Sequence, residues 1–500
     1  MPALSRITVD QLHERRWELL AVTSVGAFVT PLQAAIVAVA LPAMGPALHL
    51  SFAAAIWVQA VFLLAMAVLL IPLGRLADQY GRVHFYLAGI VVFSVGSLLC
   101  GLSTSALWLI LSRIVQGAGA ALLSVTSAAI VTAVFPPQER GRALGYNVMA
   151  VYIGLSIGPP LGGFLVDAVG WRWIFFVNIP IGIVVLVWGW LLLPRGEREQ
   201  RAAPRPDYAG AALLGAFLIC LLVPLTFAPE WGWASARSLS LLALSALSFL
   251  AFVAVQLRVS DPVLDLGLVL HNRLFAAANL AALLNYMALS AISLLTAIFL
   301  EVVQGRSAAT TGWLMLSAPV MQVLLSPSAG RLSDKVGSRV LTTTGMLLTA
   351  AGMVMLAAMP ATAGVPLIVA SLAVTGMGLA AFSAPNVSAI MGSVQRRQLG
   401  IASAFLATMR VTGQALSVAV LGGIAAGQLG AVGGRLLLTR HVGGALAQDA
   451  VRSFIYGFRL AMITGAALAA VGAAVSLTRG PHGPQHQGEP AVSQRGAGSD

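Results

Sequence analysis

Long apolar stretches separated by short polar loops run along almost the whole chain. A helix needs about 20 apolar residues to cross the hydrocarbon core of a bilayer, and this pattern predicts fourteen such spans in the 500 residues. Two crowded segments among them, 106–134 and 365–390, are also compatible by length with re-entrant loops. The pattern therefore predicts an all-α integral membrane protein, with approximate spans at 18–42, 52–73, 83–103, 106–134, 143–167, 173–193, 208–228, 238–257, 274–301, 309–329, 340–359, 365–390, 401–426 and 456–478.

The basic residues predict how these spans are oriented. If the N-terminus is cytoplasmic, the short inner loops carry fifteen Arg and Lys residues, and the short outer loops carry only Arg172, Arg237 and Arg306. An excess of positive charge in cytoplasmic loops is the usual arrangement, so we expect both termini in the cytoplasm. The dominance of Arg over the single lysine, Lys335, together with many Ala and Gly residues, is typical of a GC-rich bacterial genome. We therefore expect a multi-pass protein of the bacterial inner membrane.

The composition excludes several other classes of protein. Only 9% of residues are charged and 58% are hydrophobic, whereas a soluble domain is about 25% charged, so the lipid bilayer is the expected surrounding. The net charge of +12 is spread over loops rather than gathered on a soluble domain, which argues against nucleic acid as a partner. Two cysteines, Cys100 and Cys220, both lie in apolar runs and predict no disulfide framework. No loop is long enough for the output domain of a sensor.

An internal repeat suggests two related halves. GRLADQYGR at 74–82 matches GRLSDKVGS at 330–338, both in predicted cytoplasmic loops, and parallel repeats of this kind are typical of transporters. The first apolar run follows a polar N-terminus without a cleavage site, so we interpret it as a retained span. The predicted domains are a cytoplasmic N-terminus at 1–17, a six-helix bundle at 18–193, cytoplasmic linkers and an inserted helix pair at 194–273, a second six-helix bundle at 274–478 and a disordered cytoplasmic tail at 479–500. The second bundle is expected to contain an external loop at 427–455.

Four motifs together resemble the major facilitator superfamily, specifically its fourteen-helix drug:proton antiporters of the EmrB/QacA type. They are the loop motif at 74–82, LILSRIVQGAGAA at 109–121, GLSIGPPLGG at 154–163 and GIASAFLATMRVTGQALSVAV at 400–420. The resemblance extends from about residue 18 to 478. It implies a major facilitator fold of two six-helix bundles plus an inserted helix pair, and multidrug efflux by alternating access.

Several of these residues are candidates for gating. Asp78 can accept hydrogen bonds from a neighbouring helix N-terminus or pair with Arg82; a solvated turn that only sets topology is the alternative. The glycine-rich face of 154–163 is either a hinge or a rigid packing seam, and we expect it to pack against the other half of the molecule. The gating candidates are Gly74, Asp78, Gly81, Arg82, Gly154, Gly158, Pro159, Gly162, Gly163, Gly330, Asp334 and Gly337.

Other polar residues lie inside apolar runs and are candidates for a substrate cavity. A charged side chain at membrane depth costs roughly 2.5–3.5 kcal/mol, so Arg113 and Arg410 should each face a cavity and have a partner; an arginine snorkelling from a helix end is the alternative for Arg113. Polar residues such as Asn285 could equally hydrogen-bond between helices. The cavity candidates are Gln33, Arg113, Gln116, Asn285, Tyr286 and Arg410. Two arginines without a buried acid predict an electropositive cavity that favours neutral or anionic amphiphiles.

The first span departs from the family's pattern at Gln33, and also at Ala35 and Ala38, where the family usually has Thr and Asn. Related sequences carry an aspartate where this chain has Gln33, within LQAAIVAVALP (32–42). Gln33 and Arg113 lie at similar predicted depths, so we expect that they can meet.

None of the seventeen acidic residues falls in the interior of a predicted span, and the nearest, Asp167 and Glu301, stand at outer ends. Glu301 stands where the family usually has glutamine. We hypothesise that Glu301 is a relocated proton-coupling group; an ordinary interfacial carboxylate near Arg306 is the alternative.

These patterns predict an efflux transporter for hydrophobic or amphiphilic small molecules, drugs or secondary metabolites, which exchanges its substrate for protons. An uncoupled facilitator or a dedicated metabolite exporter of the same fold is the alternative. The chain has no HExxH or GxSxG motif and no intramembrane pair of carboxylates or histidines. We therefore expect no enzymatic activity, no cofactor and no metal site.

Overall fold

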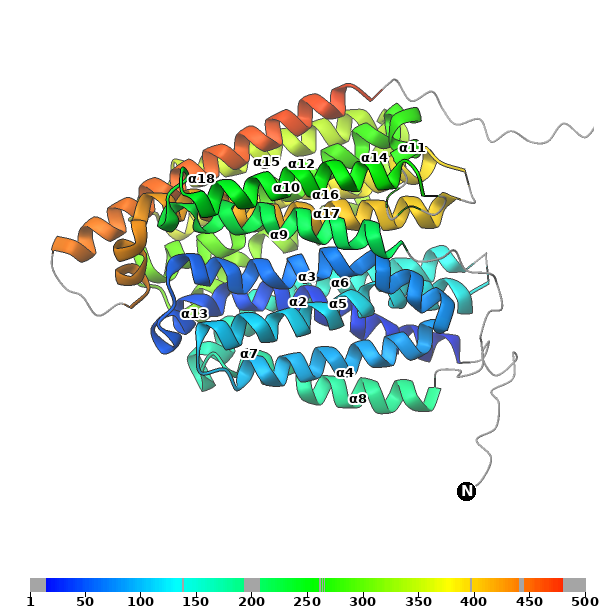
Figure 1. Ribbon diagram of the computed structural model, residues 1–500, viewed down its shortest axis with the longest axis horizontal. Coiled ribbons are helices and arrows are strands. Elements are labelled where there is room, and N and C mark those ends of the chain that lie inside the picture. The colour runs from blue at the N-terminus through cyan, green and yellow to red at the C-terminus, as the bar shows by residue number, and fades with distance from the viewer. Residues whose placement is uncertain are drawn as a thin grey trace, which may run out of the picture.

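A bundle of long, roughly parallel helices makes up the molecule in the computed structural model (Figure 1). The structure describes residues 15–136, 139–192, 207–259, 262, 264, 266–395, 398–439 and 445–479. Within these residues there is no β-strand, and fourteen helices are long and apolar enough to cross a membrane. This is the number that the hydrophobic pattern predicts, and it confirms the all-α membrane fold. The arginines at 195–205 and the predicted tail at 479–500, apart from Arg479, lie outside the described residues. Arg479 is buried, so the prediction of disorder is wrong for this residue.

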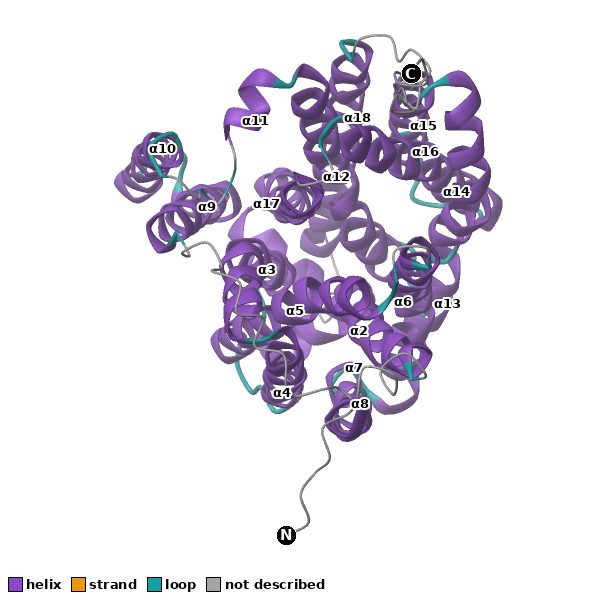
Figure 2. Ribbon diagram, turned by 90° about the vertical axis from the view of Figure 1, so that its right-hand side faces the viewer, coloured by secondary structure: helices purple, strands orange, loops and turns teal. Residues whose placement is uncertain are grey.

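The first half of the chain forms one group of packed helices. Within it α2 packs along α6, while α5 packs against both α3 and α4. Two further helices, α9 and α10, pair with each other, and α9 lies against α3 and the later helix α17 (Figure 2). The bounds are α2 (Arg16–Leu48), α3 (Phe52–Tyr80), α4 (Arg82–Gly101), α5 (Ala106–Val134), α6 (Arg140–Val169), α7 (Trp173–Phe176), α8 (Asn178–Leu192), α9 (Tyr208–Trp231) and α10 (Ala236–Gln256).

The second half forms a similar group. Here α12 packs against α17 and α18, and α16 packs against α14 and α15. Both crowded segments are single continuous helices, α5 and α16, so neither is re-entrant. The bounds are α11 (Leu266–His271), α12 (Arg273–Ile298), the π-helix η1 (Phe299–Val303), α13 (Ala308–Met315), α14 (Ser317–Val336), α15 (Ser338–Ala357), α16 (Val365–Gly392), α17 (Leu399–Thr439) and α18 (Ala445–Leu477).

The two copies of the repeat end their helices in the same way. Gly81 follows α3 with φ +109°, and Gly337 follows α14 with φ +89°. A side chain with a Cβ atom is strained at such positive φ values, so glycine is needed at this position in both copies. Each glycine lets the chain turn directly into the next helix, α4 or α15.

The expected external loop at 427–455 is largely helical, which corrects the prediction. Helix α17 continues to Thr439, with a break at Gly430 (φ 63°, ψ 175°), and α18 already begins at Ala445. This extension is packed: a Cβ atom at Gly434 would lie 2.9 Å from Phe52 Cβ, and one at Gly45 would lie 2.9 Å from Leu438 Cβ. Glycines are common in loops, but here Gly434 allows close contact with α3, and Gly45 of α2 allows close contact with Leu438.

The described ends of the chain share one end of the molecule. Helix α2 begins, and α18 ends, at what we call the termini end (Figure 1). The opposite end, which we call the far end, holds the turns at 102–105, 170–172 and 304–307. At the far end the two groups of helices touch, because α6 packs against α13 and α3 packs against α17. There Asp167 Oδ2 accepts a hydrogen bond from the backbone N–H of Ala309 at 2.8 Å.

Candidate functional site

A closed polar cluster surrounds Arg113 in the first half. Its side chain is completely buried. Nε donates to the carbonyl of Val58 on α3 at 3.0 Å, and Nη1 donates to Gln116 Oε1 at 2.7 Å. The guanidinium also lies 4.2 Å from the centre of the Phe62 ring, and Gln116 Nε2 donates to Ser97 Oγ on α4 at 2.8 Å. The cluster therefore fastens α5 to both α3 and α4.

Small residues make this close packing possible. A Cβ atom at Gly96 of α4 would lie 2.6 Å from the backbone nitrogen of Gln116, and one at Gly117 would lie 2.7 Å from the Phe62 carbonyl. Helices that approach this closely exclude water, so a charge between them needs local acceptors and aromatic faces. Arg113 and Gln116 are thus helix-fastening residues in this arrangement, and neither lines an open cavity.

Gln33 belongs to a separate hydrogen-bond group. The expected contact between Gln33 and Arg113 is therefore wrong, because the two side chains bond to different partners. Gln33 is completely buried, and its Oε1 accepts from Asn178 Nδ2 of α8 at 2.7 Å. Two buried donors, Gln33 Nε2 and Arg113 Nη2, have no hydrogen-bond partner among the described residues. Sequence reasoning missed Asn178, although a lone amide at the start of the apolar run 178–192 was the available signal.

A second cluster, which we call the central cluster, joins the two halves. It consists of Tyr152 on α6, Tyr286 on α12, Ser383 on α16 and Arg410 on α17. The hydroxyls of Tyr152 and Ser383 lie 3.1 Å apart, within hydrogen-bond distance. Tyr286 lies near Ser383 and within electrostatic reach of Arg410 and Tyr152. The cluster is therefore a polar meeting point of four helices from both halves.

Arg410 is partly buried, like Tyr152 and Tyr286, whereas Ser383 is buried. Within the part of the chain that the structure describes, the Arg410 guanidinium forms no ion pair. Adjacent to Tyr286, Asn285 is completely buried, and neither end of its amide has a hydrogen-bond partner among the described residues. Sequence reasoning missed Tyr152 and Ser383; a tyrosine two residues before the glycine motif was the only signal for the former.

Glu301 lies in the π-helical turn η1 that follows α12. Its side chain is buried, with an exposed fraction of 3% for the residue. The nearby Arg306 donates from Nε to Gln304 Oε1 at 2.7 Å. A single π-helical turn often marks a functional position. Here the turn holds the carboxylate of Glu301 in a buried position close to the far end.

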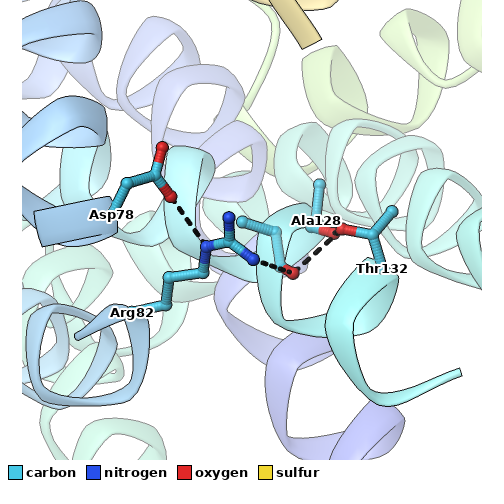
Figure 3. Close-up of polar contacts among 5 residues, drawn as sticks. Asp78, Arg82, Ala128 and Thr132 are labelled. Atoms are coloured by element: carbon cyan, nitrogen blue, oxygen red, sulfur yellow. Dashed lines mark hydrogen bonds and ion pairs between the residues drawn. The ribbon is translucent and has the colours of Figure 1, made fainter. Parts of the chain in front are cut away.

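In the loop motif, Asp78 pairs with Arg82, which is one of its expected arrangements (Figure 3). Arg82 Nε donates to Asp78 Oδ1 at 2.7 Å, which forms an ion pair between the end of α3 and the start of α4. Arg82 Nη1 also reaches the Ala129 carbonyl of α5 at 3.5 Å, and Thr132 Oγ1 donates to the Ala128 carbonyl. In the second copy, the side chain of Asp334 lies outside the described residues, and a Cβ atom at Gly330 would meet nothing within 4 Å.

The glycine-rich face of α6 packs mainly within its own half, which corrects the expectation that it contacts the other half. A Cβ atom at Gly154, Gly158 or Gly162 would overlap α2. Only Gly163 meets the second half, where a Cβ atom would overlap the Ala308 carbonyl of α13. A Cβ atom at Gly312 of α13 would in turn overlap the carbonyl of Pro159. The motif is thus a packing seam on α2 whose last residues also touch α13.

One further buried arginine was not predicted. Arg479, directly after α18, is completely buried and donates from Nη2 to Asn386 Oδ1 at 2.6 Å and from Nη1 to Thr342 Oγ1 at 3.3 Å. Burial lowers the pKa of its guanidinium to about 10, so it stays charged at neutral pH. It fastens the end of α18 to α15 and α16. The cysteines are free thiols, and no group of three or more metal-ligating side chains occurs in the described ranges.

Comparison with known proteins gives a consistent result over the whole chain. The family model for the Major Facilitator Superfamily matches residues 23–278 and 274–496. The chain is 31% identical over 497 residues to the tetracenomycin C resistance and export protein of Streptomyces glaucescens, covering 93% of this chain and 92% of that one. It is 34% identical to the multidrug resistance protein Stp of Mycobacterium tuberculosis (82% and 76% covered). It is 31% identical to the riboflavin transporter RibZ of Clostridioides difficile (81% and 87% covered).

A solved structure has a similar fold. It is a bacterial homologue of the human lysosomal transporter Spinster, crystallised in an inward-facing, unoccupied conformation, and it superposes with a TM-score of 0.67 at 18% sequence identity. The similarity covers 92% of this chain and 96% of that one. At this level of identity the comparison shows the fold alone.

Proposed function

The chain belongs to the major facilitator superfamily, and we propose that it exports hydrophobic or amphiphilic small molecules from the cytoplasm across the bacterial inner membrane. The substrates would be drugs or secondary metabolites, and the mechanism would be alternating access by the two halves. The relatives named for resistance and export support this proposal. The positive charge of the loops supports cytoplasmic termini, which makes the termini end the cytoplasmic end.

The observation that carries the proposal is the way the two halves meet. At the far end they touch through α6 on α13 and through α3 on α17, with Asp167 bonded to the backbone of Ala309. Near the middle of the bundle they meet through the hydroxyls of Tyr152 and Ser383. A few such contacts at one end can break and re-form while each half stays packed, which is what alternating access requires.

The gating residues fit roles in this motion. The pair of Asp78 and Arg82 would stiffen the cytoplasmic turn between α3 and α4, and Gly81 and Gly337 would preserve the same turn in both halves. The seam of Gly154, Gly158 and Gly162 on α2 would keep these two helices moving as one unit. Gly163 would form part of the outer gate because it touches α13.

Substrate recognition is proposed to centre on Arg410 and Tyr286. A half-buried guanidinium without an ion pair leaves a positive potential in the middle of the bundle. Two tyrosine hydroxyls and Ser383 add donors and acceptors around it. The predicted preference for neutral or anionic amphiphiles therefore rests on Arg410, since the charge of Arg113 is enclosed by its own cluster.

The experiment uses everted membrane vesicles that hold a proton gradient, followed with a pH-sensitive dye. Anionic, neutral and cationic amphiphiles are added in turn, with vesicles lacking the protein as the control. If the protein is a proton antiporter, the anionic and neutral compounds discharge the gradient. Discharge by permanent cations alone would contradict the proposed cavity.

Coupling is proposed to depend on Glu301, whose buried position allows a proton to affect the packing of η1. Replacing it in the variant Glu301→Gln removes the titratable group and keeps the shape. We expect the discharge rate to fall by about tenfold or more, because a general proton-accepting group is lost. The matched control is Glu230→Gln, which changes an exposed carboxylate near the end of α9. Unchanged discharge in Glu301→Gln would exclude Glu301 as the coupling residue.

Gln33 favours one alternative function, an uncoupled facilitator or a dedicated metabolite exporter. The amide is hydrogen-bonded to Asn178 and cannot exchange a proton near neutral pH. If this alternative holds, labelled compounds cross the membrane at the same rate after a protonophore collapses the gradient. Dependence of accumulation on the gradient would instead support antiport.

A further inference from the structure

An open pocket lies between α2 and α6 toward the termini end. It encloses about 440 Å³ and is lined by four residues of α2 and five of α6, namely Trp17, Leu20, Ala21, Ser24, Arg142, Tyr146, Met149, Ala150 and Ile153. Pockets of 300–1,000 Å³ commonly hold small organic molecules. In Figure 2, α2 and α6 are neighbours in the row of helices that faces the second half.

The lining combines aromatic faces with a guanidinium. The centre of the Arg142 guanidinium lies 5.3 Å from the Trp17 ring and 5.7 Å from the Tyr146 ring. Arg142 Nη2 also donates to the Tyr146 hydroxyl at 3.4 Å. The rings of Trp17 and Tyr146 are 6.0 Å apart and nearly perpendicular, so a flat molecule can lie against one face and meet the edge of the other.

The charge of Arg142 is available to a ligand. The nearest acidic residue, Glu139, is paired with Arg16 at 3.1 Å, and Arg142 forms no ion pair within the described residues. Deeper in the pocket, Ser24 Oγ is buried and has no hydrogen-bond partner there. The pocket thus offers a cation near its mouth and a free hydroxyl group in its wall.

The pocket leads toward the central cluster. Met149 of the pocket lies three residues before Tyr152 on α6, and residues at this spacing are neighbours on one side of a helix. Tyr152 in turn touches Ser383 of the second half. A molecule held between α2 and α6 would therefore lie about one helical turn from the residues proposed to bind substrate.

We propose that this pocket is a cytoplasmic loading site for planar aromatic compounds that carry an ionised acidic group. The inference rests on the proposed export function and adds a second binding site to it. The aromatic part would stack on Trp17 or Tyr146, the carboxylate or phenolate would bind Arg142, and a polar substituent would bind Ser24. The compound would then pass along α6 to Tyr152 and Arg410.

The test measures binding of 9-anthracenecarboxylate to the full-length protein in nanodiscs made only of zwitterionic lipid. Its neutral amide is the comparison ligand. In the variant Arg142→Gln we expect the Kd of the carboxylate to rise about fivefold and that of the amide to change less than about twofold, because only the carboxylate uses the charge. In Trp17→Leu both Kd values should rise, because both ligands lose a stacking face.

The matched control is Arg172→Gln. Arg172 also lies over a tryptophan, with its guanidinium 4.4 Å from the Trp171 ring, but at the far end of the molecule. This variant should bind both ligands like the wild type. Equal loss of carboxylate binding in both variants, or none in Arg142→Gln, would overturn the loading site.

A second arm distinguishes substrate from lipid. The measurement is repeated in nanodiscs that contain anionic lipid. If the pocket binds a lipid headgroup, anionic lipid will abolish carboxylate binding in the wild type and the loading site is wrong. If the pocket binds substrate, the fivefold effect of Arg142→Gln persists. Binding that depends on Arg142 without any transport would refute the export function and leave this site standing.

Discussion

Arg113 and Arg410 are alike in the sequence and different in the molecule. Each is the single arginine of an apolar span, Ala106–Val134 of α5 in the first half and Leu399–Gly430 of α17 in the second. Arg113 is completely buried and bonded to Val58 and Gln116, with Phe62 beneath it. Arg410 is half-buried among Tyr286, Tyr152 and Ser383 and forms no ion pair within the described chain.

The difference shows that an intramembrane charge is not by itself a binding site. What matters is whether neighbouring helices already use its donors. Glycines bring α3 and α4 so close to α5 that local acceptors enclose Arg113, whereas Arg410 lies where two halves meet through a few hydroxyls. The first arginine is therefore expected to stabilise one half, and the second is the one that we propose binds a ligand.

The largest expected effect is on stability, in the variant Arg113→Met. Gln116 Oε1 would lose its guanidinium donor and keep only the weak thiol donor of Cys100 at 3.9 Å, and a poorly satisfied buried acceptor costs about 1–3 kcal/mol. We expect the melting temperature of the purified protein to fall by about 5 °C. The double variant with Gln116→Leu should recover part of this loss, because removing both partners is less costly. A wild-type melting temperature in Arg113→Met would contradict the fastening role.

The next effect is on affinity, in the variant Arg410→Gln. We expect the KM for an aromatic carboxylate to rise about tenfold, because a charge-assisted hydrogen bond is lost, while the melting temperature stays near that of the wild type. Transport assays in vesicles and thermal melting of the same preparation give both values. The control is Arg452→Gln, which removes an exposed arginine of α18 next to Asp449. A large loss of stability in Arg410→Gln would make the two arginines equivalent.

The smallest effect is on the balance between conformations, in the variant Tyr152→Phe. It removes the hydrogen bond between the halves, whose net contribution is about 0.5–1.5 kcal/mol, so the ratio of the two populations should change by about twofold to tenfold. Pulsed EPR between spin labels at the exposed residues Val148 of α6 and Leu332 of α14 measures this shift. Tyr456→Phe, which changes an exposed tyrosine, is the control. Unchanged distance distributions would show that the hydroxyl contact does not hold the halves together.

Local patterns of the chain predicted its topology because membrane insertion depends on local properties. Apolar length alone predicted fourteen spans, and the repeat predicted two related halves with equivalent loops around Gly81 and Gly337. The segment 427–455 was predicted wrongly, because its glycines suggest a loop unless the close contact of Gly434 with Phe52 is known.

The sequence by itself located six polar residues at membrane depth, Gln33, Arg113, Gln116, Asn285, Tyr286 and Arg410, but it left open whether Glu301 is buried. Only the tertiary structure decided their partners. Gln33 bonds to Asn178 rather than to Arg113, and Ser383 lies within hydrogen-bond distance of Tyr152 from the other half. The physical reason is that hydrophobic length fixes the depth of a residue, whereas the rotation and spacing of packed helices fix which side chains lie within about 3 Å of each other.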